Sequence, residues 1–293
     1  MKFIFTADWH LRGDKPRCRL DENWIETQRQ AIRFVVEQAN ARNIPIYIGG
    51  DVFHTPRVST EVLSMTISEL ERNHCGVRVL AGNHDLPYHN YDLLHTSSVG
   101  ILTQFFSEFE YTLGINANPF GLDDSNRPEK VAISHQLVFP NEKARPMGCK
   151  ELGRIPEEVL EQFTHADFVC VGDYHHKFFY VSDSGRCVLN PGCLIRQVAD
   201  MKDYTCSIAV VDTDSRTVEW IDVPDQYELV TDEYLREEEN KEESISAFVE
   251  AIRGGKAVNL DFRANLDTRL LEAPADVRAC IQHLTQKTFN ESK

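Results

Sequence analysis

The strongest constraint in this sequence is the alternation of short apolar runs with amphipathic helical patterns along its first part. Apolar runs at residues 2–7, 44–48 and 77–80 predict strands. Apolar residues that recur every three or four positions at 24–39 and 62–70 predict helices between those strands. This order favours a largely parallel sheet with right-handed connections, so the sequence predicts an α/β fold.

Antiparallel strands are predicted in the later part of the chain. Strand and hairpin signals continue at residues 130–133, 167–171, 178–189 and 206–223. An α/β half that passes into an antiparallel half predicts a two-sheet β-sandwich flanked by helices. A smaller α+β pattern follows, which predicts a large domain over 1–225 and a small C-terminal cap over 226–293.

Length and composition exclude several classes of protein. The 293 residues are 42% hydrophobic and 26% charged, which is typical of a folded globular chain. No apolar run approaches the roughly 18 residues of a membrane span, and the N-terminal run is too short for a signal peptide. The eight cysteines form no CxxC pair, which favours reduced thiols. We therefore expect a cytoplasmic protein with no membrane association, or one in the host cytoplasm if a phage encodes it.

The net charge of −15 argues against unaided binding to nucleic acid. Phosphate neutralisation by basic side chains supplies much of the affinity for DNA, and this chain has 31 basic against 46 acidic residues. Residues 222–243 alone hold ten acidic and two basic side chains. We interpret this segment as a solvated connector, with a docking surface for a basic partner as the alternative.

Histidine, aspartate and asparagine residues gather directly after the predicted strands. In chain order these residues are Asp8 and His10, Asp51 and His54, Asn83 with His84 and Asp85, His135, and Asp173 with His175 and His176. Ligands bind in the crevice beyond the carboxyl ends of the strands in an open α/β sheet, so we expect one shared site. Taken singly, Asp51 could be a helix N-cap and His135 a core histidine.

The residue types in these motifs indicate a metal site. Carboxylate, imidazole and amide ligands without thiolate suit Mn²⁺, Fe²⁺ or Zn²⁺, and the absence of thiolate argues against a structural zinc site. The number of candidate ligands suffices for two cations. Such a pair can activate water as a nucleophile and neutralise the charge that develops on a phosphoryl group. The sequence therefore predicts phosphoester hydrolysis.

The order of these motifs resembles the calcineurin-like metallophosphoesterase superfamily over residues 8–176. The motifs are DxH, GDxFH, GNHD, a single histidine and GxxH. Within the superfamily, GGDVFHTPRVS (49–59) and NPGCLIR (190–196) are similar to the nuclease subunit of the SbcCD type. The resemblance implies a DNA repair and recombination nuclease with exonuclease activity on DNA ends and single-strand endonuclease activity.

The resemblance also implies a role for each motif residue. One metal ion would be held by Asp8, His10 and His175, a second by Asn83, His135 and Asp173, with Asp51 bridging the two. His84 would stabilise the transition state or protonate the leaving oxygen, oriented by Asp85, and His54 would help to place the DNA end. The expected cofactors are two divalent ions, with Mn²⁺ as the first choice and Mg²⁺ or Fe²⁺ as alternatives.

The last motif departs from the family pattern, because GDYHH stands where relatives have GHxH. Alignment on Gly172 puts Asp173 in place of a ligand histidine, whereas alignment on His176 would make Tyr174 the ligand. A carboxylate can ligate Mn²⁺. We choose Asp173 and His175, with His176 in reserve, and the possibility that Asp173 is no ligand stays open.

The resemblance implies three partners: DNA, an ATPase subunit of the SbcC type, and a second copy of the chain. Helices expected at 60–72 and 92–108 occupy the places where family members dimerise, although their apolar residues could equally be core. Two other functions stay open. One is a small-molecule phosphodiesterase or protein phosphatase on the same core, and the other is a catalytically silent scaffold.

Overall fold

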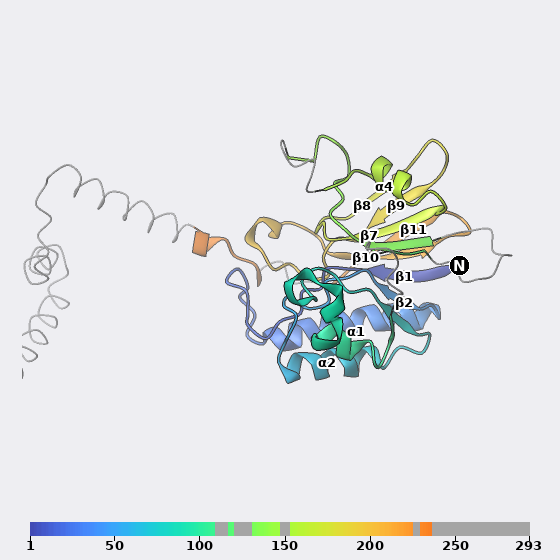
Figure 1. Cartoon of the computed structure of the whole chain (residues 1–293). Helices are drawn as coiled ribbons and strands as arrows, with labels where there is room; N and C mark the ends of the chain where they lie inside the picture. The colour runs from blue at the N-terminus through green and yellow to red at the C-terminus, as the bar shows by residue number, and fades with distance from the viewer. Residues whose placement is uncertain (109–116, 120–130, 147–152, 225–228, 236–293) are drawn as a thin grey trace, which may run out of the picture. The chain divides into compact units, whose positions relative to one another are not determined.

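The computed structural model describes residues 1–108, 117–119, 131–146, 153–224 and 229–235 (Figure 1). The chain divides into two compact units, Met1–Asp232 and Glu233–Lys293, and the first unit is described below. The predicted cap over 226–293 lies almost entirely outside the described residues. Its boundary with the large domain therefore stays a prediction.

The first of two sheets has six strands in the order β11-β10-β1-β2-β3-β4. The bounds are β1 Lys2–Thr6, β2 Ile46–Ile48, β3 Val77–Val79, β4 Ser107–Glu108, β10 Ser207–Asp212 and β11 Thr217–Asp222. Strands β1 to β4 pair in parallel, while β10 pairs antiparallel with β1 and with β11. The sequence correctly predicted the parallel half and its antiparallel continuation.

The second sheet has five strands in the order β5-β6-β7-β9-β8. The bounds are β5 Ala117–Pro119, β6 Val131–His135, β7 Phe168–Gly172, β8 Phe178–Val181 and β9 Cys187–Asn190. Apolar side chains of both sheets, including Phe5 and Tyr47 from the first and Ile133 and Leu189 from the second, form one buried cluster. The apolar layer between the sheets confirms the predicted sandwich.

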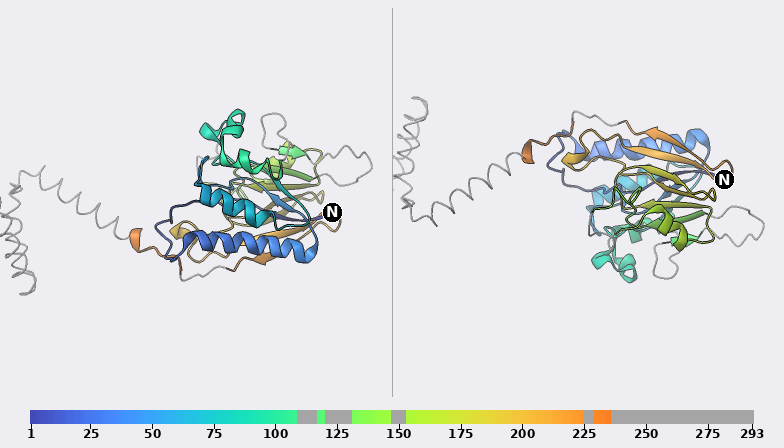
Figure 2. Two further views of the ribbon diagram at one scale, coloured as in Figure 1. Left: turned by 90° about the horizontal axis from the view of Figure 1, so that it is seen from below. Right: turned by 90° about the horizontal axis from the view of Figure 1, so that it is seen from above.

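Helices cover the outer faces of the sandwich. Helices α1 (Trp24–Arg42) and α2 (Thr60–Leu70) lie side by side on the first sheet, and α4 (Pro156–Gln162) lies on the second (Figures 1 and 2). Side chains of Asn23 and Ser59 cap the first two helices by accepting backbone N–H bonds. Among the described helices, none combines the length and apolarity needed to cross a bilayer.

The prediction of one helix over residues 92–108 was wrong. The chain instead forms the 3₁₀ helices η1 (Pro87–His89) and η2 (Tyr91–Thr96), then α3 (Ser98–Leu102) and strand β4. Ser97 separates η2 from α3 because its backbone is extended, with φ −104° and ψ 165°, and its hydroxyl accepts the N–H of Gly100. A serine that caps a new helix cannot continue the preceding one.

A buried ion pair holds the long loop between β1 and α1. The Arg19 guanidinium donates to both oxygens of Asp21, with Nε–Oδ2 at 2.7 Å and Nη2–Oδ1 at 2.8 Å. Arg19 also lies 5.3 Å from the Trp24 ring centroid and donates to the carbonyl of Arg196 at 3.4 Å. The pair therefore ties the start of α1 to the loop that follows β9.

Removal of one partner of this pair should destabilise the protein strongly. Asp21→Ala leaves the Arg19 charge buried without its carboxylate, so we expect the free energy of unfolding to fall by about 3–5 kcal/mol. Urea denaturation measures the change. Lys2→Ala is the control, because it breaks a pair with Asp212 in which Lys2 is 61% exposed, and it should cost less than about 1 kcal/mol. Equal losses in the two variants would contradict this account.

Candidate metal centre

The polar motifs meet at one edge of the sandwich, where β1, β2, β3, β6 and β7 end. Backbone bonds join the first two loops: the N–H of Asp8 donates to the carbonyl of Gly50 at 3.1 Å, and that of His10 to Asp51 at 3.0 Å. The second sheet joins them through the N–H of Asp173, which donates to the Asp8 carboxylate at 3.0 and 3.1 Å. Loops from both sheets therefore build one site.

The backbone at this edge is strained at four of the motif residues. Asp8, His10, Asp51 and Asp173 have φ values of 53°, 47°, 52° and 85°. This left-handed region costs about 1–3 kcal/mol for a residue with a side chain, and such strain clusters at functional sites. The surrounding loops thus impose a conformation that these residues would not adopt by themselves.

The Asp51 carboxylate lies at the middle of the cluster and is fully buried. Its Oδ1 accepts the N–H of His84 at 2.9 Å. Its Oδ2 lies 3.6 Å from His10 Nε2 and 3.4 Å from His135 Nε2, and it has no hydrogen-bond partner among the described residues. A buried carboxylate oxygen without a donor is costly unless a cation meets it. Asp51 therefore fits a ligand shared by two cations.

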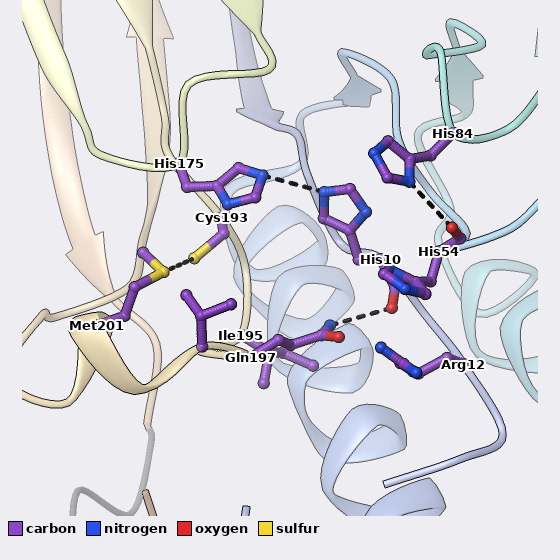
Figure 3. Close-up of a pocket in the computed structure, with 10 residues that line it drawn as sticks. His10, Arg12, His54, His84, His175, Cys193, Ile195, Gln197 and Met201 are labelled. Atoms are coloured by element: carbon purple, nitrogen blue, oxygen red, sulfur yellow. Dashed lines mark hydrogen bonds between the residues drawn. The ribbon is translucent and has the colours of Figure 1, made fainter. Parts of the chain in front are cut away.

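His10 and His175 point their ring nitrogens at one another, with the two Nε2 atoms 3.1 Å apart (Figure 3). Ligand atoms of Asp8, His10 and His175 lie within 4.8 Å of one another. Burial lowers the pKa of His10 to about 3 and also lowers the pKa of His175. Both imidazoles therefore stay neutral, which is the form that binds a metal ion.

His135 faces the other side of Asp51. Its Nδ1 lies 2.8 Å from the carbonyl of Gly49, which fixes the proton on Nδ1 and turns Nε2 toward the cluster. Nε2 lies 2.9 Å from Asn83 Oδ1 and 3.9 Å from Asp173 Oδ1. Burial opposes a charge on this ring, but the Asp51 carboxylate raises the pKa of His135 well above its usual value. A cation bound between His135 and Asp51 would replace a proton on His135 Nε2.

The alternatives for the last motif differ in where their side chains lie. The Asp173 carboxylate approaches His135, and His175 approaches His10. The His176 ring instead contacts Tyr204 and Tyr174, with centroids 4.8 and 5.6 Å apart. The geometry thus brings Asp173 and His175 into the cluster and places the His176 ring against tyrosines.

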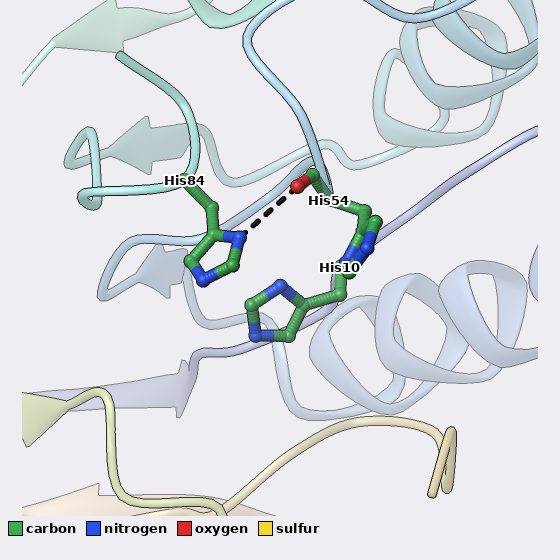
Figure 4. Close-up of side chains that lie close together, drawn as sticks. All are labelled: His10, His54 and His84. Carbon is green, nitrogen blue, oxygen red and sulfur yellow. Dashed lines mark hydrogen bonds between the residues drawn. The ribbon is translucent and has the colours of Figure 1, made fainter. Parts of the chain in front are cut away.

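His84 and His54 line the open side of the cluster together with His10 (Figure 4). The His84 Nδ1 lies 3.0 Å from the backbone carbonyl of His54, so Nδ1 carries the proton and Nε2 is left for other partners. Ring centroids of His84 and His10 are 4.8 Å apart, and those of His84 and His54 are 5.6 Å apart. A ligand in the pocket would meet all three rings.

The expectation that Asp85 orients His84 is not what the structure shows. The Asp85 carboxylate accepts the backbone N–H groups of Val52, Phe53 and Gly82 at 3.1, 2.8 and 2.9 Å. Burial, and then the nearby Asp51 charge, raise the pKa of Asp85 to about 7 against these three bonds. Asp85 therefore joins the loops after β2 and β3, and the carbonyl of His54 orients His84.

Sequence reasoning missed Gln197 and two glycines at this site. The Gln197 Nε2 donates to the carbonyls of Trp9 and His10, each at 3.0 Å, and no sequence signal marks this glutamine. A Cβ atom at Gly82 would collide with Asp51, and one at Gly50 with His135. Gly50 directly precedes Asp51, and Gly82 directly precedes Asn83. These two glycines were the sequence signal that a Cβ atom does not fit at these positions.

Gly82→Ala should therefore disrupt the cation site. At an Mn²⁺ concentration near 100 times its Kd, we expect the wild-type melting temperature to rise by roughly 5–10 °C, because the cation binds only the folded state. Gly82→Ala should lose most of this rise, since the methyl group displaces Asp51. Gly13→Ala is the control, because its added Cβ would meet only ordinary contacts at 3.6 Å or more. A full rise in Gly82→Ala would contradict the assigned geometry.

Comparisons with solved structures find similar chains at low identity. Zinc-bound Vps29 from Entamoeba histolytica is 12% identical, with 76% of this chain and 100% of that chain covered and a TM-score of 0.37. TT1561 from Thermus thermophilus is 12% identical, with coverage of 76% and 99% and a TM-score of 0.44. A dimetal phosphatase from Danio rerio is 13% identical, with coverage of 72% and 92% and a TM-score of 0.42. No protein of curated function matches the chain.

A family model gives the stronger result. The model for calcineurin-like phosphoesterases matches residues 1–177 of the 293, which includes every motif from Asp8 to His175. The matched segment thus supplies all the side chains that the fold brings together around Asp51. The protein belongs to the calcineurin-like phosphoesterase family, and this membership implies hydrolysis of phosphoester bonds.

Proposed function

We propose that this protein is a DNA nuclease that hydrolyses phosphodiesters at a centre of two divalent ions, with Mn²⁺ as the expected metal. The observation that carries the proposal is the buried Asp51 Oδ2, which lies between His10 Nε2 and His135 Nε2 without a hydrogen-bond donor among the described residues. Asp8 and His175 have ligand atoms within 4.8 Å of His10, Asp8 also groups with Asp51 and His135, and Asn83 and Asp173 approach His135.

Each side chain of the site has a defined task in this reaction. Two bound cations would supply charge neutralisation at the phosphoryl group and an activated water. His84, whose Nδ1–H donates to the carbonyl of His54, would need a second proton on Nε2, and from there it would stabilise the transition state or protonate the leaving oxygen. His54 lines the same pocket and would help to place the DNA end.

DNA is the proposed substrate because of two sequence segments, one that extends a shared family motif and one that lies outside these motifs. The segments GGDVFHTPRVS and NPGCLIR are similar to the nuclease subunit of the SbcCD type. The net charge of −15 favours a partner that supplies basic surface, and we propose an ATPase of the SbcC type acting in DNA repair, recombination or replication. We place this complex in the cytoplasm, or in the host cytoplasm for a phage protein.

Cleavage of DNA tests the proposal directly. With Mn²⁺, the wild-type protein should digest end-labelled duplex and single-stranded DNA, and Asp51→Ala should abolish the cleavage because both cations lose their shared ligand. Gel analysis of the labelled products measures the activity. Turnover of a cyclic nucleotide or a phosphopeptide without DNA cleavage would favour the small-molecule phosphodiesterase or protein phosphatase. Absence of any hydrolysis by metal-loaded protein would favour the scaffold.

His84→Ala should separate catalysis from metal binding. We expect its rate of DNA cleavage to fall by about 10²- to 10⁴-fold, because a positioned imidazole that transfers a proton is worth that much. Calorimetric titration with Mn²⁺ should give the wild-type stoichiometry, since His84 is absent from the proposed ligand set. Loss of bound metal in this variant would overturn the role of His84.

We also propose that the protein is a homodimer. Helix α2 packs on α3, and Ile101 and Phe105 near that contact are 46% and 55% exposed, which supports an apolar contact surface. Sedimentation at micromolar concentration should show a dimer, and Phe105→Asp should shift it toward monomer. Wild-type protein that sediments only as a monomer would remove the dimer from the proposal.

A further inference from the structure

The pocket beside the histidines has a second, apolar side. It is formed by Ile195 and Val198 with the sulfur-containing side chains of Cys193 and Met201 (Figure 3). The pocket volume is about 140 Å³. This volume covers the histidine side as well as the apolar side, and it is close to the roughly 150 Å³ in which an apolar cavity accepts a ring of the size of benzene.

Two polar side chains frame this apolar side. The Gln197 amide is fixed in orientation, because Nε2 donates to the carbonyls of Trp9 and His10. Its Oε1 is buried and has no hydrogen-bond partner among the described residues, which leaves an unused acceptor beside the pocket. Arg12 lines the same pocket, and its guanidinium is oriented by Asp14, with Nε–Oδ1 at 3.0 Å.

We propose that this side of the pocket binds the nucleoside that adjoins the cleaved phosphodiester. The inference rests on the proposed nuclease function and names the part of the substrate that this surface recognises. The base would lie against Ile195 and Val198, and one of its N–H groups would donate to Gln197 Oε1. Arg12 would meet a neighbouring phosphate, for which a guanidinium is well suited.

Continuity with the histidines favours a nucleoside over an unrelated ligand. His10, His84 and His175 line the same pocket as Ile195 and Val198, so a group bound there lies next to the phosphoryl position. The apolar surface matches a base, and Gln197 Oε1 matches an N–H group of that base. Arg12 matches an adjoining phosphate. A phosphopeptide would offer no flat ring as a general feature.

Val198 is the residue that tests this subsite without disturbing the metal centre. It is 44% exposed, directly precedes the 3₁₀ helix η3 (Ala199–Met201), and has no part in the proposed ligand set. Val198→Asp puts a carboxylate where the base would lie. The charge is tolerated there because the position is exposed to solvent. Val181→Asp on β8 is the matched control, because Val181 is 53% exposed and does not line the pocket.

Two chromogenic esters distinguish the nucleoside from the phosphodiester itself. The p-nitrophenyl ester of thymidine 5′-monophosphate carries a nucleoside beside the leaving group, whereas methyl p-nitrophenyl phosphate carries only a methyl group there. With Mn²⁺, Val198→Asp should lower kcat/KM for the thymidine ester by roughly tenfold, mainly through KM, and should leave the methyl ester within about twofold. Val181→Asp should match the wild type on both esters.

A binding measurement without metal supports the kinetic one. Addition of thymidine 5′-monophosphate should shift the methyl resonances of Ile195 and Met201 in the wild type, and Val198→Asp should weaken this binding roughly tenfold. Equal loss on both esters, or no loss on either, would overturn the nucleoside subsite while the phosphodiesterase activity stands. Shifted methyl resonances without hydrolysis of either ester by the wild type would instead contradict the proposed reaction and leave the subsite supported.

Discussion

The rest of the site depends on one buried carboxylate oxygen that two imidazoles face. Asp51 Oδ2 lies between His10 and His135 at 3.6 and 3.4 Å without a hydrogen-bond donor in the described part of the chain. Charge buried in this way is stable only with a counter-charge, and the neutral His10 ring cannot supply one. Asp51 raises the pKa of His135, so a charge on that ring can supply the counter-charge, and bound cations would supply it in its place.

Residues from both sheets surround this carboxylate. The first sheet supplies the loops of Asp8 and Asp51, and the second supplies His135 and Asp173. Bonds between the sheets then lock the loops together: His135 Nδ1 to the carbonyl of Gly49, and the N–H of Asp173 to Asp8. Because the apolar layer between the sheets sets their spacing, core packing determines the distances between the side chains of the cluster.

Most of the fold and the members of the cluster could be predicted because both follow from local patterns. Apolar periodicity marks the strands, and polar residues that follow parallel strands must meet at one edge. The prediction of a helix over residues 92–108 was wrong because apolar spacing does not reveal that Ser97 starts a new helix. The binding of Asp85 to loop amides and of Gln197 to two carbonyls depends on tertiary contacts, which no local pattern encodes.

The left-handed backbone at Asp8, His10, Asp51 and Asp173 has a consequence for how such a chain evolves. Glycine adopts this conformation without strain, and asparagine tolerates it better than most residues do. Replacement of these side chains by glycine would therefore relieve local strain, but it would remove the candidate ligands and, at Asp8, the bond that joins the two sheets. Selection for a relaxed backbone and selection for the chemistry of the site therefore act in opposite directions at these four positions.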